Sequence, residues 1–277
     1  MQSNLPPAQW RLLRHAAAPG AWNMAVDEAI LQAVIAGDSP PTLRLYAWEP
    51  ACISLGYAQP IADVDRAALA ARGWEIVRRP TGGRAILHTD ELTYSVIGPD
   101  SEPRLAGGVL ESYQRLSGAL LAALEHLVVP VVSQRKNGLA PNGDPNPVCF
   151  EVPSDYELTV DGKKLVGSAQ ARRGGAVLQH GTLPLHGDIR RITEVLHFAD
   201  EAQRDATAER VASRAATVAS ALGREVAWDE AAAAFVHGFQ HALGIELIEG
   251  QLSAAELAGA EDWLRERYAN PDWTERV

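Results

Sequence analysis

Apolar residues recur at helical spacing in two long stretches of the chain. In 22–37, which reads WNMAVDEAILQAVIAG, Val26, Ile30 and Val34 fall on one side of a helix and a glycine follows as a stop. In 109–127, which reads VLESYQRLSGALLAALEHL, tyrosine and leucines form a similar stripe. Both stretches are predicted to be helices that pack against a core.

Shorter apolar stretches are typical of strands. We predict strands in TLRLYAW (42–48), in ACISLGY (51–57), in WEIVRRP (74–80), and twice within GRAILHTDELTYSVIG (83–98). From 188 onward the pattern is helical, with a short strand in IELIEG (245–250). Alternation of this kind predicts a mixed α+β fold.

A stretch rich in Pro, Asn and Gly separates the second helix from the next strands. Over 133–147 it reads SQRKNGLAPNGDPNP, which predicts a long loop, and loops of that length are often functional. The dipeptides Asp161-Gly162 and Gly174-Gly175 follow, and both are typical of tight hairpin turns. We therefore expect a three-stranded meander.

The turn at Asp161-Gly162 pairs Thr159 with Lys164 and Val160 with Lys163. Lys164 is then expected on a polar face with Thr159 and Ser168, opposite Leu158 and Leu165. The second turn pairs Gln170 with Gln179. Strict alternation puts His180 on the other face from Lys164, unless a bulge near Gly167 or Gly181 reverses it. The sequence leaves this question open.

Composition narrows the class of protein. The chain has 277 residues, 47% of them hydrophobic and 22% charged, with a formal net charge of −10. This charge argues against non-specific binding to nucleic acid or to anionic membranes. No apolar run is long enough to span a bilayer, and the N-terminus has no signal-peptide pattern. With only two cysteines, the sequence predicts a reducing, cytoplasmic compartment.

The two cysteines differ in setting. Cys52 lies in an apolar strand and is expected in the core, while Cys149 lies in a Pro-rich stretch just before the hairpin. A free cysteine is usually a small buried hydrophobe. A loop position favours a reactive thiol instead, because a nearby lysine ammonium would lower the thiol pKa. Cys149 is the candidate nucleophile, and Lys163 and Lys164 are the candidate partners, although paired strand lysines are often only solvated.

Gly82 and Gly83 form the second candidate site. They follow a Pro-Thr pair, and Arg78, Arg79 and Arg84 flank them. A glycine turn lets the backbone approach a ligand, and arginines suit a phosphate or carboxylate, including the phosphopantetheine of an acyl carrier. A hairpin turn with solvated arginines explains the pattern equally well, and the nearby histidine at position 88 is more often an ordinary one.

Several motifs, in this order, make the chain resemble the lipoate/biotin protein ligase superfamily. They are NMAVDEA, SLGYAQP, RRPTGGRAILHTDELTYSV, DGKKLVGSAQ and LQHGTL, and they extend over roughly the first 250 residues. The resemblance implies an α+β fold with a large mixed sheet flanked by helices and a smaller sheet. It also implies a single catalytic domain over 1–277 with a helical C-terminal part over 188–277.

Within this superfamily the chain is similar to the cysteine-type octanoyltransferases. Their pattern Cys-Phe-x-x-Pro-Ser-x-Tyr-Glu-Leu matches VCFEVPSDYEL at Cys149. The resemblance implies transfer of octanoyl from octanoyl-acyl carrier protein to a lysine of a lipoyl-domain protein, through a thioester on Cys149 with Lys164 as its partner. The implied acceptor is a glycine cleavage H protein, with lipoyl domains of 2-oxoacid dehydrogenases as a further option. No cofactor and no metal are implied. The remaining candidate residues are assigned to substrate binding: Arg78, Arg79, Gly82, Gly83, His88, Gly167, Ser168, His180 and Gly181.

Three alternatives stay open. An ATP-dependent lipoate–protein ligase would use the arginines to hold an acyl-adenylate, with Cys149 as a bystander. An amidotransferase between lipoyl domains would need no ATP, but its cysteine context differs and it lacks the Gln-His-Gly seen here at 179–181. A non-catalytic acyl-binding subunit would bind the donor without forming an adduct.

Overall fold

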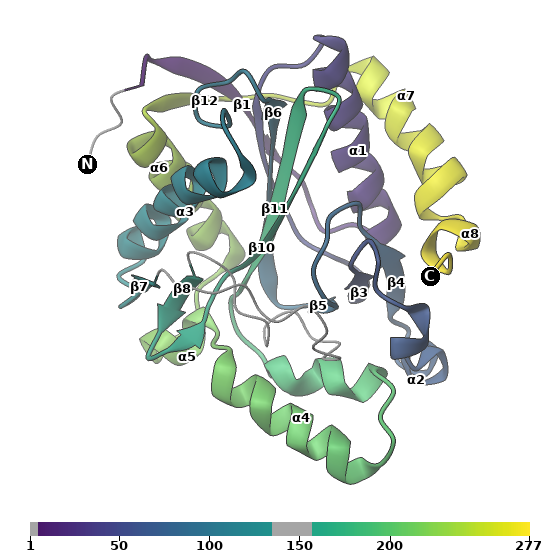
Figure 1. The fold of residues 1–277 in the computed structure, drawn as a ribbon. Coiled ribbons are helices and arrows are strands. Elements are labelled where there is room, and N and C mark those ends of the chain that lie inside the picture. The colour runs from purple at the N-terminus through teal and green to yellow at the C-terminus, as the bar shows by residue number, and fades with distance from the viewer. Residues whose placement is uncertain (1–4, 135–156) are drawn as a thin grey trace.

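The computed structural model describes residues 5–134 and 157–277 (Figure 1). Cys149, and most of the loop predicted over 133–147, lie outside the described residues.

Strands and helices are interspersed along the described residues. The strands are β1 (Ala8–Arg14), β2 (Thr42–Tyr46), β3 (Cys52–Leu55), β4 (Glu75–Arg78), β5 (Ile86–His88), β6 (Glu91–Pro99), β7 (Val132–Gln134), β8 (Glu157–Val160), β9 (Lys163–Lys164), β10 (Gly167–Arg173), β11 (Ala176–Pro184) and β12 (Ile245–Glu249). The helices are α1 (Gly20–Ala36), α2 (Arg66–Ala71), α3 (Val109–His126), α4 (Glu201–Arg214), α5 (Val218–Leu222), α6 (Trp228–Leu243), α7 (Ala254–Trp263) and α8 (Pro271–Thr274), with short helical turns η1 (Ile61–Asp63), η3 (Ile189–Val195) and η4 (Leu264–Tyr268).

A six-stranded mixed sheet forms the centre, in the order β10-β11-β6-β2-β1-β12. β1 runs parallel to both β2 and β12, whereas β2, β6, β11 and β10 pair antiparallel. β12 comes from the C-terminal part of the chain, so the helical region after 188 contributes an edge strand to this sheet. The short strand predicted over 245–250 is therefore confirmed.

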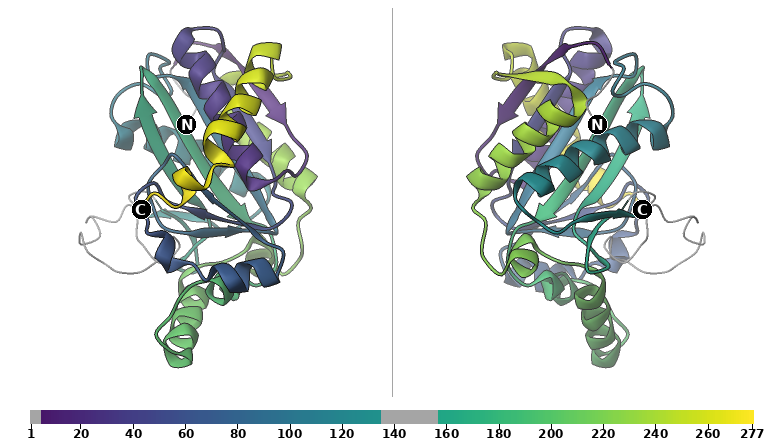
Figure 2. Two further views of the ribbon diagram at one scale, coloured as in Figure 1. Left: turned by 90° about the vertical axis from the view of Figure 1, so that its right-hand side faces the viewer. Right: turned by 90° about the vertical axis from the view of Figure 1, so that its left-hand side faces the viewer.

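Helices cover both faces of this sheet. α3 and α6 lie on one face and α1 and α7 on the other, as the two side views of Figure 2 show. Neighbouring strand residues accordingly enter different cores: Leu12 packs with the α3 and α6 side, and Leu13 with the α1 side. Val96 and Ile97 divide in the same way. Because helices cover both faces, nearly every residue of β2, β6 and β11 is buried.

Two smaller sheets adjoin the large one, in the orders β4-β3-β5 and β7-β8-β9. The predicted turn at Asp161-Gly162 is confirmed, with Thr159 opposite Lys164 and both turn residues at positive φ. The second turn and the pairing of Gln170 with Gln179 are confirmed as well.

The prediction of a continuous three-stranded meander is wrong. Strand β9 ends at Lys164, and β10 begins only at Gly167 in the large sheet. The two intervening residues, Leu165 and Val166, are buried in the main hydrophobic core. Lys164 and Ser168 therefore belong to different sheets, and strand alternation cannot be counted across the break.

The fold class is confirmed, with two smaller sheets where the sequence predicted one. The predicted helices match α1 and α3, and Gly37 ends α1 in the left-handed conformation. Of the helices in the described ranges, none is both long enough and apolar enough to cross a membrane.

Candidate active site

A cavity lies where α1, the β11 side of the large sheet and the β3–β5 pair meet. Its walls combine residues that are far apart in the sequence. They are Met24, Tyr46, Trp48, Ser54, Arg79, Ile86, His88, Thr93, Gly167, Ser168, Ala169, His180, Gly181 and Thr182.

Six of the residues singled out from the sequence meet in this cavity. They are Arg79, His88, Gly167, Ser168, His180 and Gly181. The structure thus answers the question left open for His180: it reaches the cavity, because the break after Lys164 removes the alternation that placed it elsewhere. Gly181 is required here, since a Cβ at that position would lie 2.6 Å from the carbonyl oxygen of Gly167 and 2.7 Å from the ring of Tyr94.

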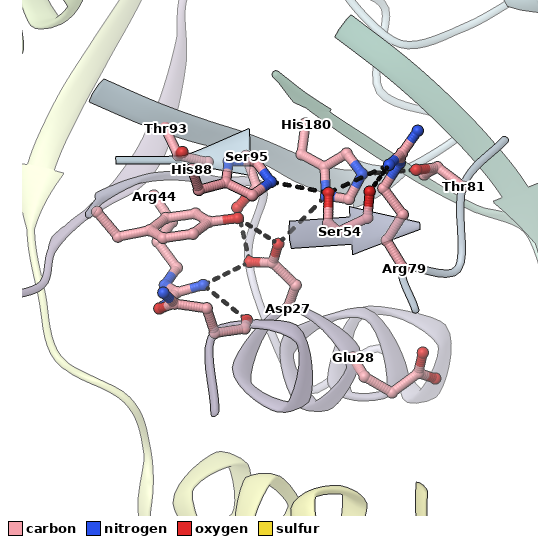
Figure 3. A network of polar contacts seen from close by, with 12 residues as sticks. Asp27, Glu28, Arg44, Ser54, Arg79, Thr81, His88, Thr93, Ser95 and His180 are labelled. Atoms are coloured by element: carbon pink, nitrogen blue, oxygen red, sulfur yellow. Dashed lines mark hydrogen bonds and ion pairs between the residues drawn. The ribbon is translucent and has the colours of Figure 1, made fainter. Parts of the chain in front are cut away.

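A row of polar side chains crosses three strands and faces α1. Arg44 of β2 pairs with Ser95 of β6, which pairs with His180 of β11. Asp27 of α1 meets all three (Figure 3). Its Oδ1 accepts hydrogen bonds from Arg44 Nη1 and from Ser95 Oγ, each at 2.8 Å, and its Oδ2 lies 3.6 Å from His180 Nδ1. The hydroxyl of Tyr46 also donates to Oδ2, at 3.1 Å.

Charge and burial fix the protonation of this row. Burial alone would raise the pKa of the Asp27 carboxyl, but Arg44 and the contact with His180 hold the pKa below its ordinary value. Burial lowers the pKa of His180, and Asp27 only partly opposes that shift. His180 is therefore neutral at pH 7. Its Nε2 lies 2.6 Å from Oγ1 of Thr81, which ties β11 to the Gly-Gly turn.

A second chain of hydrogen bonds holds His88. Its Nδ1 lies 2.6 Å from Glu91 Oε1, and its Nε2 lies 2.8 Å from Ser54 Oγ. Because a carboxylate only accepts, a neutral His88 donates from Nδ1 and accepts the Ser54 hydroxyl at Nε2. Serine, histidine and carboxylate occur in this order in hydrolase triads. Here Arg79 also donates to Ser54 Oγ, at 3.1 Å, and Ser54 is only 1% exposed, so the chain fixes the wall rather than presenting a nucleophile.

The Gly-Gly turn lines a separate surface groove of about 540 Å³, together with Tyr57, Thr81, Arg84 and Gln170. Gly83 has a positive φ of 94°. Its carbonyl oxygen comes so near to Gly56 that a Cβ on Gly56 would lie 2.0 Å away. Two glycine segments therefore pack backbone against backbone at this point.

Arg78, predicted to contribute to recognition, is engaged with the protein's own backbone. Arg78 is fully buried, and its guanidinium donates to the carbonyl oxygens of Gly56, Gln59 and Thr274. It joins the loop after β3 to the C-terminal helix α8. Arg79 is also buried, and it donates to backbone carbonyls on both sides of the turn. The sequence showed a basic cluster, but the backbone carbonyls that occupy two of these guanidinium groups were not visible in it.

The two hairpin lysines differ in their environment. Lys163 donates from Nζ to the carbonyl oxygen of Ala212, at 2.8 Å, in the last turn of α4. Lys164 is 5% exposed, and its backbone carbonyl accepts from Ala216. Cys52 is fully buried, as predicted, and burial raises the pKa of its thiol. Within 5–134 and 157–277, no group of three or more His, Cys, Asp or Glu side chains is arranged to hold a metal ion.

Residues 19–240 match the family model described as the lipoyl protein ligase A/B catalytic domain. The chain belongs to this family. A protein named octanoyltransferase LipM from Symbiobacterium thermophilum is 42% identical over 271 residues, which cover 96% of this chain and 98% of the relative. A second protein of that name, from Kyrpidia tusciae, is 42% identical over 274 residues, with the same coverage of both chains. With relatives this similar over nearly the whole chain, the protein is an acyltransferase, and the resemblance seen in the sequence is confirmed.

The fold agrees with solved structures of this family. The bipartite lipoate protein ligase of Thermoplasma acidophilum superposes with a TM-score of 0.81 at 25% identity, covering 97% of this chain and 96% of that one. Sequence reasoning had missed several site residues that this fold brings together, among them Asp27, Arg44, Trp48 and Glu91. One signal was available: Asp27 and Glu28 are charged residues inside a largely apolar helix, where burial without a partner is costly.

Proposed function

We propose that the protein transfers an octanoyl group from octanoyl-acyl carrier protein to a lysine of a lipoyl-domain protein. This would be the first step in making protein-bound lipoate within the cell. The observation that carries the proposal is the similarity of nearly the whole chain to proteins named octanoyltransferase, together with a cysteine in the sequence context VCFEVPSDYEL.

The proposed reaction has two steps. The thiolate of Cys149 attacks the thioester carbonyl, and the carrier leaves as a thiolate that takes up a proton. The uncharged ε-amine of the acceptor lysine then attacks the Cys149 thioester. The C–S bond breaks, so that Cys149 leaves as the thiolate, and the nitrogen loses a proton to give the amide. Both donor and intermediate are thioesters, so the reaction needs no ATP and no cofactor.

Lys164 is proposed as the partner of Cys149. A buried ammonium would favour the thiolate and the developing oxyanion, and could carry the proton between steps. Its burial supports this role, because a lysine is seldom this buried without a specific use. Lys163 is already engaged with the end of α4 and is left out of the chemistry.

The cavity is proposed to hold the acyl chain. Its walls include Met24, Trp48 and Ile86, and Gly167 reaches it three residues after Lys164. An acyl chain entering there would replace contact with water by contact with apolar side chains, at about 0.8 kcal/mol for each buried CH₂.

The acceptor is proposed to be a glycine cleavage H protein, with lipoyl domains of 2-oxoacid dehydrogenases as the second choice. The bipartite ligase of Thermoplasma acidophilum was analysed together with its E2 lipoyl domain, which supports a lipoyl-domain acceptor for the present protein. We further propose that residues 1–277 act as one catalytic domain, since β12 from the helical part pairs with β1 in the central sheet. A cytoplasmic location is proposed from the low number of cysteines.

An ATP-dependent ligase is the alternative, because a lipoate-protein ligase A bound with ATP shares the fold, with a TM-score of 0.78 at 25% identity. The test is transfer from octanoyl-carrier to an apo H protein, with and without ATP, and the intact mass of the enzyme after the donor alone. We expect turnover without ATP and an octanoyl adduct on Cys149. Cys149→Ala should lose both, and Cys52→Ala should keep both. Transfer that requires ATP, or that survives in Cys149→Ala, would favour the ligase.

A further inference from the structure

The wall of the cavity contains a buried hydroxyl group that lacks a hydrogen-bond partner. Thr182 of β11 lines the cavity and is 1% exposed, and its Oγ1 has no partner among the described residues. A hydroxyl that is buried without a partner destabilises the folded protein, because it gives up its bond to water and gains none in return. Such a group in the wall of a candidate substrate cavity is expected to have a role in binding or catalysis.

The other polar side chains in the described wall are already engaged. Each of them makes at least one hydrogen bond with another part of the protein. Trp48, for example, donates to Thr93 at 2.8 Å, and the hydroxyl of Ser168 lies 2.8 Å from that of Tyr94. These side chains therefore shape the cavity, whereas the hydroxyl of Thr182 is available as a donor to a bound molecule.

Strand geometry directs the Thr182 side chain to the α1 side of the sheet. Thr182 and His180 are two residues apart in β11 and so share a face, and on that face His180 meets Asp27 of α1. Thr182 is also the β11 partner of Gly167, which begins β10 three residues after Lys164. The hydroxyl therefore lies in the part of the cavity beside the strand that leads back to Lys164.

An octanoyl thioester offers this hydroxyl one good acceptor. Apart from the carbonyl group, its acyl part consists of CH₂ and CH₃ groups, and a sulfur bonded to carbon is a weak acceptor. The cavity measures about 30 Å³, so an acyl chain that enters it displaces water and leaves the hydroxyl to the carbonyl oxygen. A donor that is held in place before the reaction stabilises a developing negative charge without reorganisation.

We propose that Thr182 donates a hydrogen bond to the acyl carbonyl oxygen and stabilises the oxyanion that forms there. The proposal rests on the proposed function, which supplies the thioester and the nucleophile. When the Cys149 thiolate adds to the carbonyl carbon, the π electron pair moves to the oxygen that Thr182 contacts. That pair returns to form the C=O bond as the C–S bond to the carrier breaks, and the carrier leaves as a thiolate. The Thr182 proton stays on its own oxygen throughout.

The first experiment measures single-turnover loading of the full-length enzyme by octanoyl-carrier. Thr182→Val keeps the shape of the side chain but removes the hydroxyl, and loading should slow by about 10²–10³-fold. Thr182→Ser keeps the hydroxyl and should stay within a few-fold of wild type. The urea midpoint of Thr182→Val should not fall, because the substitution removes a buried group that has no partner to lose.

Thr42→Val is the matched control, since it makes the same substitution in β2 of the same sheet. Thr42 is fully buried, but its hydroxyl donates to the carbonyl oxygen of Pro40 at 2.9 Å. This variant should lower the urea midpoint and keep the wild-type loading rate, which is the reverse of the result expected for Thr182→Val. A Thr182→Val enzyme that is folded by circular dichroism and loads within a few-fold of wild type would overturn the proposal. If Thr182→Val does not fold, Thr182→Ala takes its place.

The infrared band of the bound carbonyl group separates this proposal from the proposed function. Cys149→Ala cannot form the thioester, so octanoyl-pantetheine that is isotope-labelled at the carbonyl carbon stays intact when it binds. The band should lie at a lower frequency in Cys149→Ala than in the double variant that also carries Thr182→Val. A lowered band in a protein whose wild type transfers no acyl group would support the contact and reject the proposed function. Equal bands would overturn the contact even if transfer occurs, and a thioester that does not bind would overturn both.

Discussion

The cavity and the lysine hairpin are built in opposite ways. The cavity lies on long strands of the central sheet, β6 and β11 with nine residues each, and side chains beside it bond to one another, as Arg44 does to Asp27 and His88 to Glu91. The hairpin sheet consists of strands of three, four and two residues. There the Lys163 side chain bonds to a neighbouring backbone carbonyl. The proposed acyl pocket thus lies on the long strands of the central sheet and the proposed chemistry on a sheet of short strands, where local opening costs less free energy.

Among the predicted effects, the largest is the loss of stability on removing the carboxylate of Asp27, which lies beside the cavity. Asp27→Ala leaves the guanidinium of Arg44 buried without its partner, and we expect a loss of about 3–5 kcal/mol in the free energy of unfolding. Urea denaturation measures it. Asp262→Ala is the control, because Asp262 pairs with Arg265 in solvent and should contribute at most about 1 kcal/mol. Equal losses for Asp27→Ala and Asp262→Ala would show that the buried ion pair contributes no more to stability than the exposed one.

The hairpin should respond in rate rather than in stability. Lys164→Ala should slow the loading of Cys149 by about 10²–10³-fold, equivalent to roughly 3–4 kcal/mol of transition-state stabilisation. Lys163→Ala should stay within a few-fold of wild type, since its Nζ donates to the carbonyl oxygen of Ala212 at the end of α4. Lys164→Arg should not restore the rate, because a guanidinium stays protonated near neutral pH and cannot carry a proton between the two steps. Single-turnover loading measures all three variants, and equal losses at 163 and 164 would contradict the assignment.

Arg78, beside the Gly-Gly turn, should contribute to stability rather than to carrier binding. Arg78→Met removes the guanidinium donors from the buried carbonyl oxygens of Gln59 and Thr274 and should cost about 2–3 kcal/mol in the free energy of unfolding. Arg66→Met is a matched control, since Arg66 also reaches the C-terminal segment, through Glu275, but in solvent. It should cost at most about 1 kcal/mol. A large rise in KM for the carrier in Arg78→Met, without loss of stability, would restore the recognition role.

The smallest predicted effect is a dependence of the free energy of unfolding on pH, caused by buried histidines near the cavity. Burial and the neighbouring Arg44 lower the pKa of His15 to about 4, and burial lowers the pKa of His180. Below the ordinary histidine pKa of 6.5, the unfolded chain binds protons that the folded chain does not, so stability falls as pH falls from 6.5 toward 4. The urea midpoint measured at pH 7, 6 and 5 should therefore decrease.

A histidine variant tests the origin of this slope. His15→Gln should flatten part of it, because Gln carries no titrating group and can still accept the Arg44 hydrogen bond that Nδ1 of His15 now receives. His197→Gln, at an exposed position, should keep the wild-type slope. A His15→Gln slope equal to that of wild type would assign the pH dependence to other groups.

Local patterns were predicted well from the sequence, and for a clear reason. The α1 helix, its glycine stop, both hairpin turns and the pairing of Thr159 with Lys164 each depend on residues within a few positions of one another. Turn dipeptides and helical spacing encode such features directly. The motif order likewise identified the family before any contact was known.

Long-range features could not be predicted in this way. Asp27, Arg44, Ser95 and His180 are distributed over more than 150 positions, and only the strand order brings them into one row. The same holds for the wall formed by Trp48 and His88.

The sequence by itself therefore determined the family, the main elements and the residue types available for chemistry. Tertiary structure decided which of these residues face the cavity and which only bind the backbone. Arg78 and Arg79 are neighbours in the chain, yet Arg78 holds the C-terminal helix in place while Arg79 lines the cavity. Burial turned an apparent basic cluster into internal hydrogen bonds, because a buried charge must find its partners wherever the fold provides them.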